Sequence, residues 1–345
     1  MWWGVALLLL ALWVGASRAG WIDTGGSNSF LSRLGGGVRR HAHATHRGYG
    51  DSDTRSGALV PEPDPMPERA RQIAAHFAPD AKVLVLEVLD VDQGDAILMT
   101  LPDGEHILMD AADKLLPSGQ NPAHELLMPS LASRHLTKID LAIASHPHED
   151  HIGGFVEVMR TYPLHEFWDC GLSYSTRTYR DLLLELKSEH VAFNVPPTGF
   201  QRTLPDSVTL TVNQAPKDLF LDPNNHSLLV RVDYGTFSAL LTGDMEDARA
   251  RHVLDEGWFR PVTVLKAAHH GSHTSIFEGY LRAVRPQYIA ISCGANNSYG
   301  HPHADALEAY RRLGGTLNRT DLDGTITYLT DGHTVVAYTA RKRPS

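Results

Sequence analysis

Three histidines and two carboxylates fall within six residues of one segment, S-H-P-H-E-D-H-I-G-G, at residues 145–154. Imidazole and carboxylate groups together suit zinc, manganese or iron. A loop that leaves a strand can direct alternate side chains at one point. We therefore expect His146 and His148 to converge on one metal ion, and Asp150 and His151 to serve a second. The alternative interpretation is a polar surface loop.

Further candidate ligands lie at the ends of three other apolar runs. Asp244 follows the run L-L-T-G, where a carboxylate could bridge two metal ions about 3.5–4 Å apart. His269 and His270 follow the run that ends at Lys266, and His226 precedes another run. Taken alone, Asp244 could be a turn residue or a helix cap, and the paired histidines could be structural. Their repeated placement beside predicted strands favours a metal centre.

Strands and helices alternate along the chain and must position these ligands. Strands are predicted at residues 83–91, 96–101, 106–110, 139–145, 227–234, 237–243, 262–266 and 288–292, with two more around Asp331 and Gly332. Helices are predicted at residues 68–77, 123–134, 180–190, 246–254, 276–284 and 304–313. Hairpins around Gly104 and Gly235, mixed with strand–helix units, indicate a layered α/β protein with mixed sheets.

The composition is that of a globular protein with a sizeable core. Of the 345 residues, 42% are hydrophobic and 21% are charged, and the length suits one large domain or two small ones. The net charge of -9 argues against nonspecific electrostatic binding of nucleic acid. A local basic groove is still compatible with this charge. Cys170 and Cys293 could form one bridge, but two cysteines are too few for a disulfide framework or a cysteine-rich zinc site.

Residues 1–19 are predicted to be a signal peptide. Residues 5–14 (VALLLLALWV) form an apolar run, and Ser17 and Ala19 fit a signal-peptidase site. The run is shorter than the roughly 20 apolar residues of a membrane span. We expect a secreted or periplasmic protein with no membrane partner beyond this leader. Because no Lys or Arg precedes the run, an uncleaved membrane anchor is the alternative.

Residues 20–67 are predicted to be a flexible linker, and residues 68–345 a folded domain. The linker is rich in Gly, Ser, Arg and His and then in Pro, and it cannot bury enough apolar surface to fold alone. His41, His43 and His46 in this linker could bind metal loosely, but a solvated segment is the favoured interpretation.

The motif formed by His146, His148, Asp150 and His151 resembles the H-x-H-x-D-H signature of the metallo-β-lactamase superfamily. Four other stretches resemble the soluble hydrolase domain of bacterial DNA-uptake (competence) channel proteins. They are DVDQGDA at residues 90–96, LLTGDME at 240–246, LKAAHHGSHTS at 265–275, and NSYGHPH…RTDLDG at 297–324. Secreted phosphorylcholine esterases share this plan. The resemblance covers about residues 83–338.

The resemblance implies a four-layer αβ/βα sandwich with mixed sheets and a binuclear metal site. One metal ion would be held by His146, His148 and His226, and the other by Asp150, His151 and one of His269 or His270, with Asp244 as the bridge. Asp150 and His269 are the residues expected to act in catalysis; His270 is the favoured ligand, and His269 would face the substrate. The family usually has glycine at the position of Asp92, and Asp95 would either orient a ligand or be a turn residue.

These implications predict an exported metal-dependent hydrolase. Two divalent ions, zinc with manganese as the alternative, would activate a shared water as the nucleophile. A phosphodiester substrate, DNA or another phosphate ester, is expected, and contacts to phosphate could come from Lys266, His273, His301, His303 and Arg319. The alternatives are a lactone or β-lactam hydrolase of the same fold, and a binding module that retains a vestigial site.

Overall fold

The computed structural model of the chain describes residues 59–217, 222–295 and 297–341. They belong to the second of the two units into which the chain divides, Arg55–Ser345. The predicted signal peptide, the linker as far as residue 58, and the trio His41, His43 and His46 lie outside the described residues. Among the described residues, no helix combines the length and the hydropathy that a membrane span requires.

The first sheet has eight strands among the described residues, in the order β15-β14-β1-β2-β3-β4-β5-β6. The bounds are β1 Leu84–Val88, β2 Ile97–Thr100, β3 His106–Met109, β4 Ile139–Ile143, β5 Leu164–Trp168, β6 Ala192–Asn194, β14 Ile326–Thr330 and β15 Val335–Thr339. Strands β15 to β3 pair antiparallel in this order, and β3 to β6 pair parallel. The change from antiparallel to parallel pairing makes the sheet mixed, as predicted.

The second sheet has seven strands among the described residues, in the order β13-β12-β11-β10-β9-β8-β7. The bounds are β7 Gln201–Thr203, β8 Thr209–Asn213, β9 Leu229–Tyr234, β10 Phe237–Leu241, β11 Val264–Lys266, β12 Tyr288–Ile291 and β13 Thr316–Arg319. Strands β10 to β13 run parallel, and β7 to β10 pair antiparallel. The carboxyl ends of β10, β11 and β12 therefore lie at one edge of this sheet.

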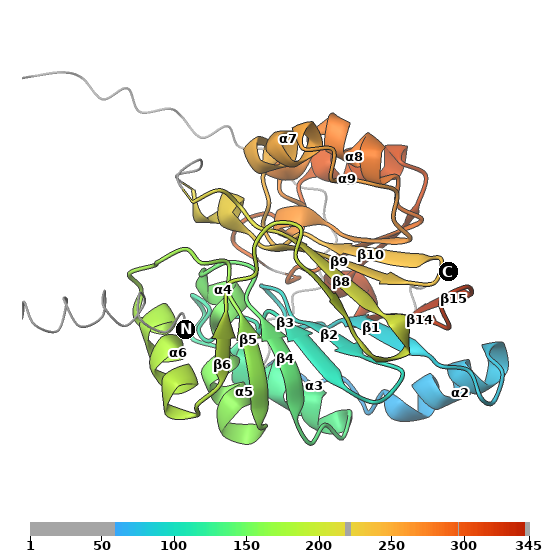
Figure 1. The fold of residues 1–345 in the computed structure, drawn as a ribbon, viewed down its shortest axis with the longest axis horizontal. Helices are drawn as coiled ribbons and strands as arrows, with labels where there is room; N and C mark the ends of the chain where they lie inside the picture. The colour runs from blue at the N-terminus through green and yellow to red at the C-terminus, as the bar shows by residue number, and fades with distance from the viewer. Residues whose placement is uncertain (1–58, 218–221, 296, 342–345) are drawn as a thin grey trace, which may run out of the picture. The chain divides into compact units, whose positions relative to one another are not determined.

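Helices cover the outer faces of the two sheets, so the described domain has four layers (Figure 1). On the side of the first sheet lie the helices α3 Met128–Ser133, α5 Phe155–Thr161 and α6 Arg177–Ser188, and on the side of the second sheet α7 Asp247–Asp255, α8 Glu278–Val284 and α9 Ala304–Arg312. The remaining helices are α2 Met66–His76, η1 Ala123–Leu127, α4 Glu149–Ile152 and α10 Thr320–Asp323, and short turns are η2 Pro205–Ser207, η3 Pro223–His226, η4 Ala268–Gly271 and η5 His273–Ser275.

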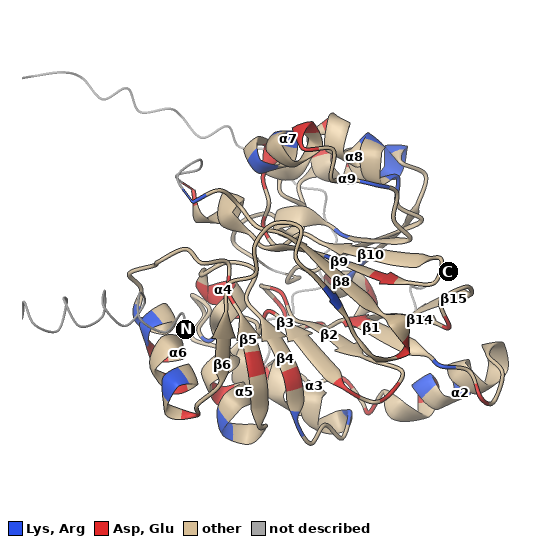
Figure 2. Cartoon of the chain, in the orientation of Figure 1, with Lys and Arg blue, Asp and Glu red and all other residues tan. Residues whose placement is uncertain are grey.

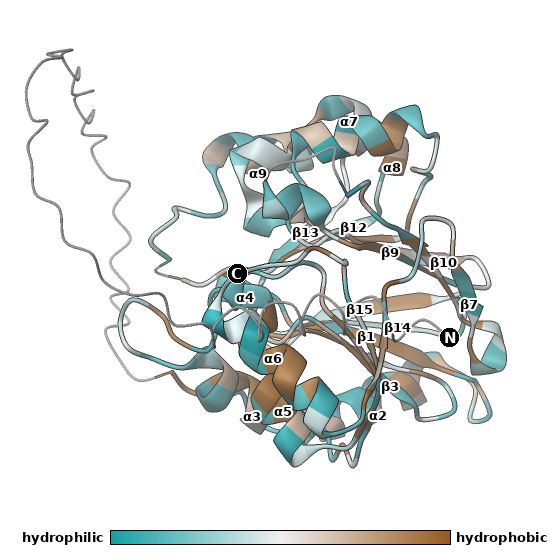
Figure 3. Ribbon diagram, turned by 60° about the vertical axis from the view of Figure 1, so that its left-hand side comes forward, coloured by the Kyte–Doolittle hydropathy of each residue, from teal (hydrophilic) through white to brown (hydrophobic). Residues whose placement is uncertain are grey.

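Three hydrophobic clusters hold the layers together. Residues of both sheets, such as Met99, Ile143 and Val230, form the cluster between the sheets. A second cluster joins the first sheet to its helices, and a third joins the second sheet to α7, α8 and α9. Figure 3 shows the corresponding contrast, with largely hydrophobic strands and much of the helical surface hydrophilic. Because burial of apolar surface is the main stabilising term in folding, these clusters fix the strand ends that carry the polar loops.

The predicted architecture of two mixed sheets with helices outside them is confirmed. The two predicted hairpins are present as the antiparallel pairs β2–β3 and β9–β10. Five strands, β5, β6, β7, β8 and β13, were not predicted. The predicted helix at residues 123–134 is present, but its first turn is the π-helical segment η1.

Two further expectations differ from the structure. Cys170 and Cys293 are both buried free thiols, so the single bridge that the sequence left open is not formed. The amino-terminal boundary of the folded part also lies earlier than residue 68. Helix α2 begins at Met66, and the Glu62 carboxylate already accepts a hydrogen bond of 2.8 Å from the backbone N–H of Thr325.

Candidate metal centre

The loop after β4 carries the histidine-rich motif and is held by close backbone packing. A side chain on Gly94 would overlap the carbonyl oxygen of Asp150, and the backbone N–H of Asp95 donates a hydrogen bond of 3.1 Å to this oxygen. On the other side of the loop, a side chain on Gly154 would overlap the carbonyl oxygen of Ala111. Glycine at both positions therefore lets two neighbouring segments press against the loop and fix the direction of its side chains.

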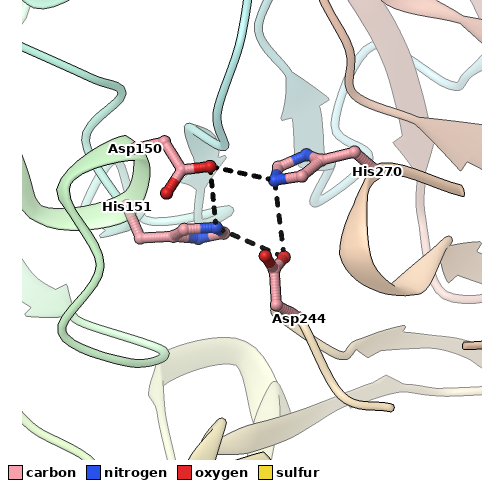
Figure 4. A group of neighbouring side chains, drawn as sticks. All are labelled: Asp150, His151, Asp244 and His270. Atoms are coloured by element: carbon pink, nitrogen blue, oxygen red, sulfur yellow. Dashed lines mark ion pairs between the residues drawn. The ribbon is translucent and has the colours of Figure 1, made fainter. Parts of the chain in front are cut away.

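Four predicted ligands converge at one point, and they come from three separate segments. Asp150 and His151 lie on α4, Asp244 lies just after β10, and His270 lies on η4 after β11 (Figure 4). One ligand atom from each lies within 4.8 Å of the others. His151 Nε2 is 3.2 Å from Asp244 Oδ1, and His270 Nε2 is 3.3 Å from Asp150 Oδ2. This clustering is the arrangement that the strand-end argument predicted.

The donor atoms of this cluster fit a divalent cation. His151 Nε2, His270 Nε2 and Asp244 Oδ1 are buried, and none has a hydrogen-bond partner. His151 Nε2 and His270 Nε2 lie 3.2 and 3.5 Å from Asp244 Oδ1, as ion pairs without hydrogen-bond geometry, and a cation at this point could bind all three atoms. Two imidazole nitrogens with carboxylate oxygens form a donor set that suits zinc or manganese.

A second group of predicted ligands lies on the other side of Asp244. His146 Nε2 is 3.0 Å from His148 Nδ1 and 3.9 Å from Asp244 Oδ2. His146 is fully buried, and its ring centroid is 4.2 Å from that of His151. One oxygen of Asp244 thus faces His151 and the other faces His146. This is the geometry expected of a bridging carboxylate between two metal positions.

The position of His226 beside this second group stays a prediction. Its side chain is 3% exposed, in η3 directly before β9. The neighbouring residue does reach the centre, because the side-chain Oγ of Ser227 accepts a hydrogen bond of 3.0 Å from the backbone N–H of Asp244. In addition, the backbone N–H of Leu228 donates a hydrogen bond of 2.8 Å to the carbonyl oxygen of Ser145.

His269 and His270 lie in different surroundings although they are adjacent. Both have left-handed backbone conformations, with φ of 49° and 54°, which cost about 1–2 kcal/mol per non-glycine residue. The His270 side chain is 1% exposed and points into the cluster, whereas His269 is 20% exposed. His269 Nε2 is 3.6 Å from Asp244 Oδ2, and its Nδ1 is 3.3 Å from Glu246 Oε1. This geometry supports His270 as the ligand and His269 as the residue nearer the solvent.

A buried carboxylate orients one predicted ligand histidine and a backbone carbonyl orients another, and sequence reasoning missed both. Asp110 Oδ2 is 2.8 Å from His151 Nδ1, and its Oδ1 accepts a hydrogen bond of 2.7 Å from the backbone N–H of Ser145. Asp110 follows the buried strand β3, the same signal that identified Asp244. His270 Nδ1 has its hydrogen-bond partner in the carbonyl oxygen of Ser292, at 3.0 Å, and Asp95 Oδ1 lies farther from it, at 3.4 Å.

The electrostatics of the cluster are dominated by mutual attraction of its buried members. Burial alone would raise the pKa of Asp244, but His270 and His151 outweigh this effect and hold it well below its usual range. Burial would likewise lower the pKa of His270, yet Asp244 and Asp95 raise it well above its usual value. Asp150 is also held ionised, because His151 and His270 lower its pKa against the effect of burial. Metal binds ionised carboxylates and neutral imidazoles, so a cation at this centre would displace the proton of His270.

The centre opens into a cavity of about 840 Å³. Residues His148, Asp150, Asp244 and His270 line it. We call this cavity the metal-site cleft. The predicted ligands are thus accessible to a small substrate.

The residues predicted to contact phosphate lie in different surroundings. His301 lines the metal-site cleft, as its predicted role requires. Lys266 does not fit this role, because it is fully buried and its Nζ lies 2.7 Å from Asp95 Oδ2. Arg319 is engaged by Asp321, with 2.5 Å between Nη2 and Oδ2.

His273 and His303, the other two candidates, face each other outside the cluster. Their Nδ1 atoms are 3.1 Å apart, and their ring centroids 4.4 Å. Their contact with a substrate stays a prediction.

Comparison with known proteins places this geometry in a family. The sequence model of the Metallo-beta-lactamase superfamily matches residues 89–294. ComE operon protein 3 of Bacillus subtilis is 27% identical over 253 residues, which cover 70% of this chain and 32% of that protein. Recombination protein 2 of Haemophilus influenzae is 28% identical over 241 residues, covering 70% of this chain and 28% of that protein. The chain thus spans about a third of the length of these relatives.

Two solved structures align with parts of the chain. CmlA, a diiron β-hydroxylase from Streptomyces venezuelae, aligns with a TM-score of 0.48 at 14% identity, over 75% of this chain and 56% of that one. The metallo-beta-lactamase fold protein YhfI from Bacillus subtilis aligns with a TM-score of 0.42 at 12% identity, over 68% of this chain and 96% of that one. The family match spans the strands and loops that carry the ligand cluster, and the chain belongs to the metallo-beta-lactamase superfamily.

Proposed function

We propose that the chain is an exported, binuclear metal-dependent hydrolase that cleaves phosphodiesters. The observation that carries this proposal is the position of Asp244. Its Oδ1 lies 3.2 Å from His151 Nε2, and its Oδ2 lies 3.9 Å from His146 Nε2, so one carboxylate lies between two buried histidines that belong to different sets of ligands. A site of this kind holds two cations side by side.

The ligands divide into two sets around Asp244. His146 and His148, with His226 as the predicted third member, would hold one ion, and Asp150, His151 and His270 would hold the other. Zinc is the proposed metal, with manganese as the alternative. When bound, two such ions supply a water of lowered pKa and neutralise negative charge that develops on the scissile group.

The chain's own residues would position the substrate and its leaving group. His269 lies at the edge of the metal-site cleft, and Glu246 fixes the direction of its ring through the 3.3 Å contact to Nδ1. Thr274 in turn donates a hydrogen bond of 2.8 Å to Glu246 Oε1. The Nε2 side of His269 is thereby directed toward Asp244 and the cleft. Burial opposes the charge on this ring, but Asp244 and Glu246 raise its pKa, and the protonated ring can donate a hydrogen bond from Nε2 to an oxygen of the substrate.

The substrate class rests on the relatives and on the cleft. Two of the relatives are named Recombination protein 2 and Competence protein ComA, so a phosphodiester of nucleic acid is the first substrate to test. His301 lines the cleft and stacks near His270, with ring centroids 6.0 Å apart, so it is available for contact with a phosphate oxygen. Export rests on the apolar leader at residues 5–14 and is proposed with it.

A hydrolysis screen of the zinc-loaded full chain tests the proposal. The substrates are bis-p-nitrophenyl phosphate, single-stranded DNA and nitrocefin, and the variants are His148→Ala and, as a matched control, His165→Ala. His165 lies on β5 with its side chain 60% exposed. We expect phosphodiester cleavage by the wild type and the control. In His148→Ala it should fall by more than the roughly 10–100-fold typical of losing an outer partner of a metal ligand.

Two outcomes would contradict the proposal. Absence of any cleavage at two bound metal ions per chain would favour a binding module with a vestigial site. Turnover of nitrocefin alone would instead favour the lactone or β-lactam hydrolase alternative.

A further inference from the structure

A second cavity, of about 680 Å³, adjoins the metal-site cleft. The two share Gln93, Asp113 and Tyr299 in their linings, so they are neighbouring parts of one depression. We call the second cavity the acidic chamber, because the carboxylates of Asp92 and Asp113 lie in its lining. A substrate bound at the metal-site cleft can extend into this chamber.

The wall between the two cavities contains an unsatisfied hydrogen-bond acceptor. Gln93 is only 4% exposed, and its Oε1 is buried without a hydrogen-bond partner. The next residue, Gly94, packs against the carbonyl of Asp150, which ties this wall directly to the metal centre. An acceptor left unpaired at such a place carries a desolvation cost that a ligand N–H could remove.

The charges of Asp92 and Asp113 are not balanced by the protein. Among the described residues, no Lys, Arg or His nitrogen lies within ion-pair distance of either carboxylate. Asp113 Oδ1 accepts a hydrogen bond of 2.9 Å from the backbone N–H of Leu115, which does not neutralise it. The other two carboxylates of the lining are paired, Asp90 with Arg341 and Asp321 with Arg319. The acidic chamber therefore has an excess of negative charge.

The position of Asp92 is built into the backbone. Its φ is 60°, in the left-handed region that glycine adopts most readily. A side chain on Gly294 would overlap Asp92 Oδ1, so the glycine at residue 294 leaves the room that this carboxylate fills. Burial raises the pKa of Asp92 because it disfavours the charged form. A cation in the chamber would offset this cost.

The chemistry of the lining selects among cations. The lining includes the two carboxylates that have no ion-pair partner and the amide oxygen of Gln93 that has no hydrogen-bond partner, so the complementary group should donate several hydrogen bonds. A quaternary ammonium group has no N–H to donate. A bare metal ion is disfavoured, because the groups of three or more metal-type ligands that converge within 4.8 Å among the described residues both lie at the metal centre. Lys and Arg residues appear on several of the outer helices (Figure 2), and the Arg341 side chain that belongs to this lining is paired with Asp90.

We infer that the acidic chamber binds a primary ammonium group carried by the substrate, next to the ester cleaved at the metal centre. This inference rests on the proposed function for the cleavage step but not for the binding step. It narrows the substrate class to phosphate esters in which one substituent carries a protonated primary amine. Asp92 and Asp113 would supply the charge, and Gln93 Oε1 would accept one N–H.

Three chromogenic esters test this inference on the zinc-loaded full chain: the 4-nitrophenyl phosphodiesters of ethanolamine, choline and ethanol. We expect kcat/KM for the ethanolamine ester to exceed that for the ethyl ester by about tenfold or more, as charge-assisted hydrogen bonds warrant. The choline ester, which has the charge without the N–H groups, should lie nearer the ethyl ester. The ratio of kcat/KM values is used because it does not depend on the fraction of folded protein.

Substitutions in the chamber should remove the preference. In Asp92→Asn, Asp113→Asn and Gln93→Met the ratio should fall toward one, whereas Asp255→Asn, an exposed change at the end of α7, should keep it. A wild-type ratio near one, with the ethyl ester hydrolysed, would overturn the inference and leave the proposed function intact. A ratio that survives all three chamber substitutions would also overturn it.

A binding measurement decides the case in which no ester is hydrolysed. By calorimetry, phosphoethanolamine should bind the zinc-loaded chain about tenfold more tightly than ethyl phosphate does, and Asp92→Asn should abolish the difference. Equal binding of the two phosphates would refute the chamber assignment on its own. Absence of hydrolysis with a retained binding preference would refute only the proposed function.

Discussion

At the scale of single residues, the candidate centre depends on hydrogen-bond acceptors that hold histidine rings in place. Asp110 contacts His151 Nδ1 at 2.8 Å, and the carbonyl oxygen of Ser292 contacts His270 Nδ1 at 3.0 Å. Because each contact uses Nδ1, the Nε2 atom of the same ring is available to bind a metal ion at the centre. The buried Nε2 atoms of both rings have no hydrogen-bond partner, as this division of roles requires.

Removal of the Asp110 charge should weaken metal binding without unfolding the chain. In Asp110→Asn the side-chain oxygen can still accept the 2.7 Å hydrogen bond from the backbone N–H of Ser145. The amide no longer attracts the N–H of His151, so the ring is less well oriented and its Nε2 is less basic as a ligand atom. We expect zinc affinity to fall by roughly 10–100-fold, measured by competition with a chromophoric chelator.

The matched control for this prediction is Asp255→Asn, a change of the same kind at an exposed position on α7. Its zinc affinity should equal that of the wild type. If Asp110→Asn also binds zinc within threefold of the wild type, Asp110 does not support the metal ligand, and its contact with His151 is only structural.

At the scale of elements, the carboxyl ends of parallel strands supply most of the centre. Strand β4 leads into the motif at residues 145–154, β10 leads to Asp244, and β11 leads to His270. The carboxyl ends of strands are the usual place for ligands in open α/β sheets. The chain therefore needs both sheets to complete one site.

A buried ion pair connects β11 to the loop after β1. Lys266 Nζ lies 2.7 Å from Asp95 Oδ2, and both side chains are fully buried. Burial opposes the charge on the carboxylate, but Lys266 and then His270 lower the pKa of Asp95 to about 2. Asp95 is therefore ionised at neutral pH, and its charge depends on this lysine for compensation.

Breaking this pair should destabilise the domain strongly. Lys266→Met leaves a buried carboxylate uncompensated, and we expect the free energy of unfolding to fall by roughly 3–5 kcal/mol in urea titrations. The double variant Lys266→Met, Asp95→Asn should recover part of this loss, because the uncompensated charge is removed as well. A single variant as stable as the wild type would show that the pair contributes no net stability.

The elements that sequence reasoning found and missed differ in length and burial. Strand β4 was predicted because its apolar run ends directly at the polar motif. Strands β6 and β7 have three residues each, A-F-N and Q-R-T, with both end residues exposed, so no hydrophobic pattern marks them. They form because β5 and β8 offer hydrogen-bonding partners, which is information from the whole sheet and not from the local sequence.

The candidate site was predictable where residue type alone suggests chemistry. His146, His151, Asp244 and His270 do lie together, as their strand-end positions indicated. The acidic chamber could not be predicted, because Asp92 and Asp113 line one cavity only through the fold, and the unpaired state of Gln93 Oε1 has no trace in the sequence. Lys266 was misjudged because a lysine at a strand end is usually solvated, whereas here Asp95 holds it inside.

At the scale of the whole domain, the proposed metal ions would join the two sheets. His151 follows β4 of the first sheet, while Asp244 and His270 follow β10 and β11 of the second. A ligand that binds only the folded state stabilises it by about 2.7 kcal/mol at a free concentration one hundred times its Kd. For a domain of this size we therefore expect free zinc at that level to raise Tm by about 5–10 °C, measured by differential scanning calorimetry against the EDTA-treated chain. Asp244→Ala should lose most of this shift, because it removes the one carboxylate that faces both ligand sets, whereas His124→Gln, a change at a surface contact with Glu157, should keep it. An equal shift in Asp244→Ala would mean that zinc stabilises the domain from some other place, and the link between the two sheets through the metal centre would have to be abandoned.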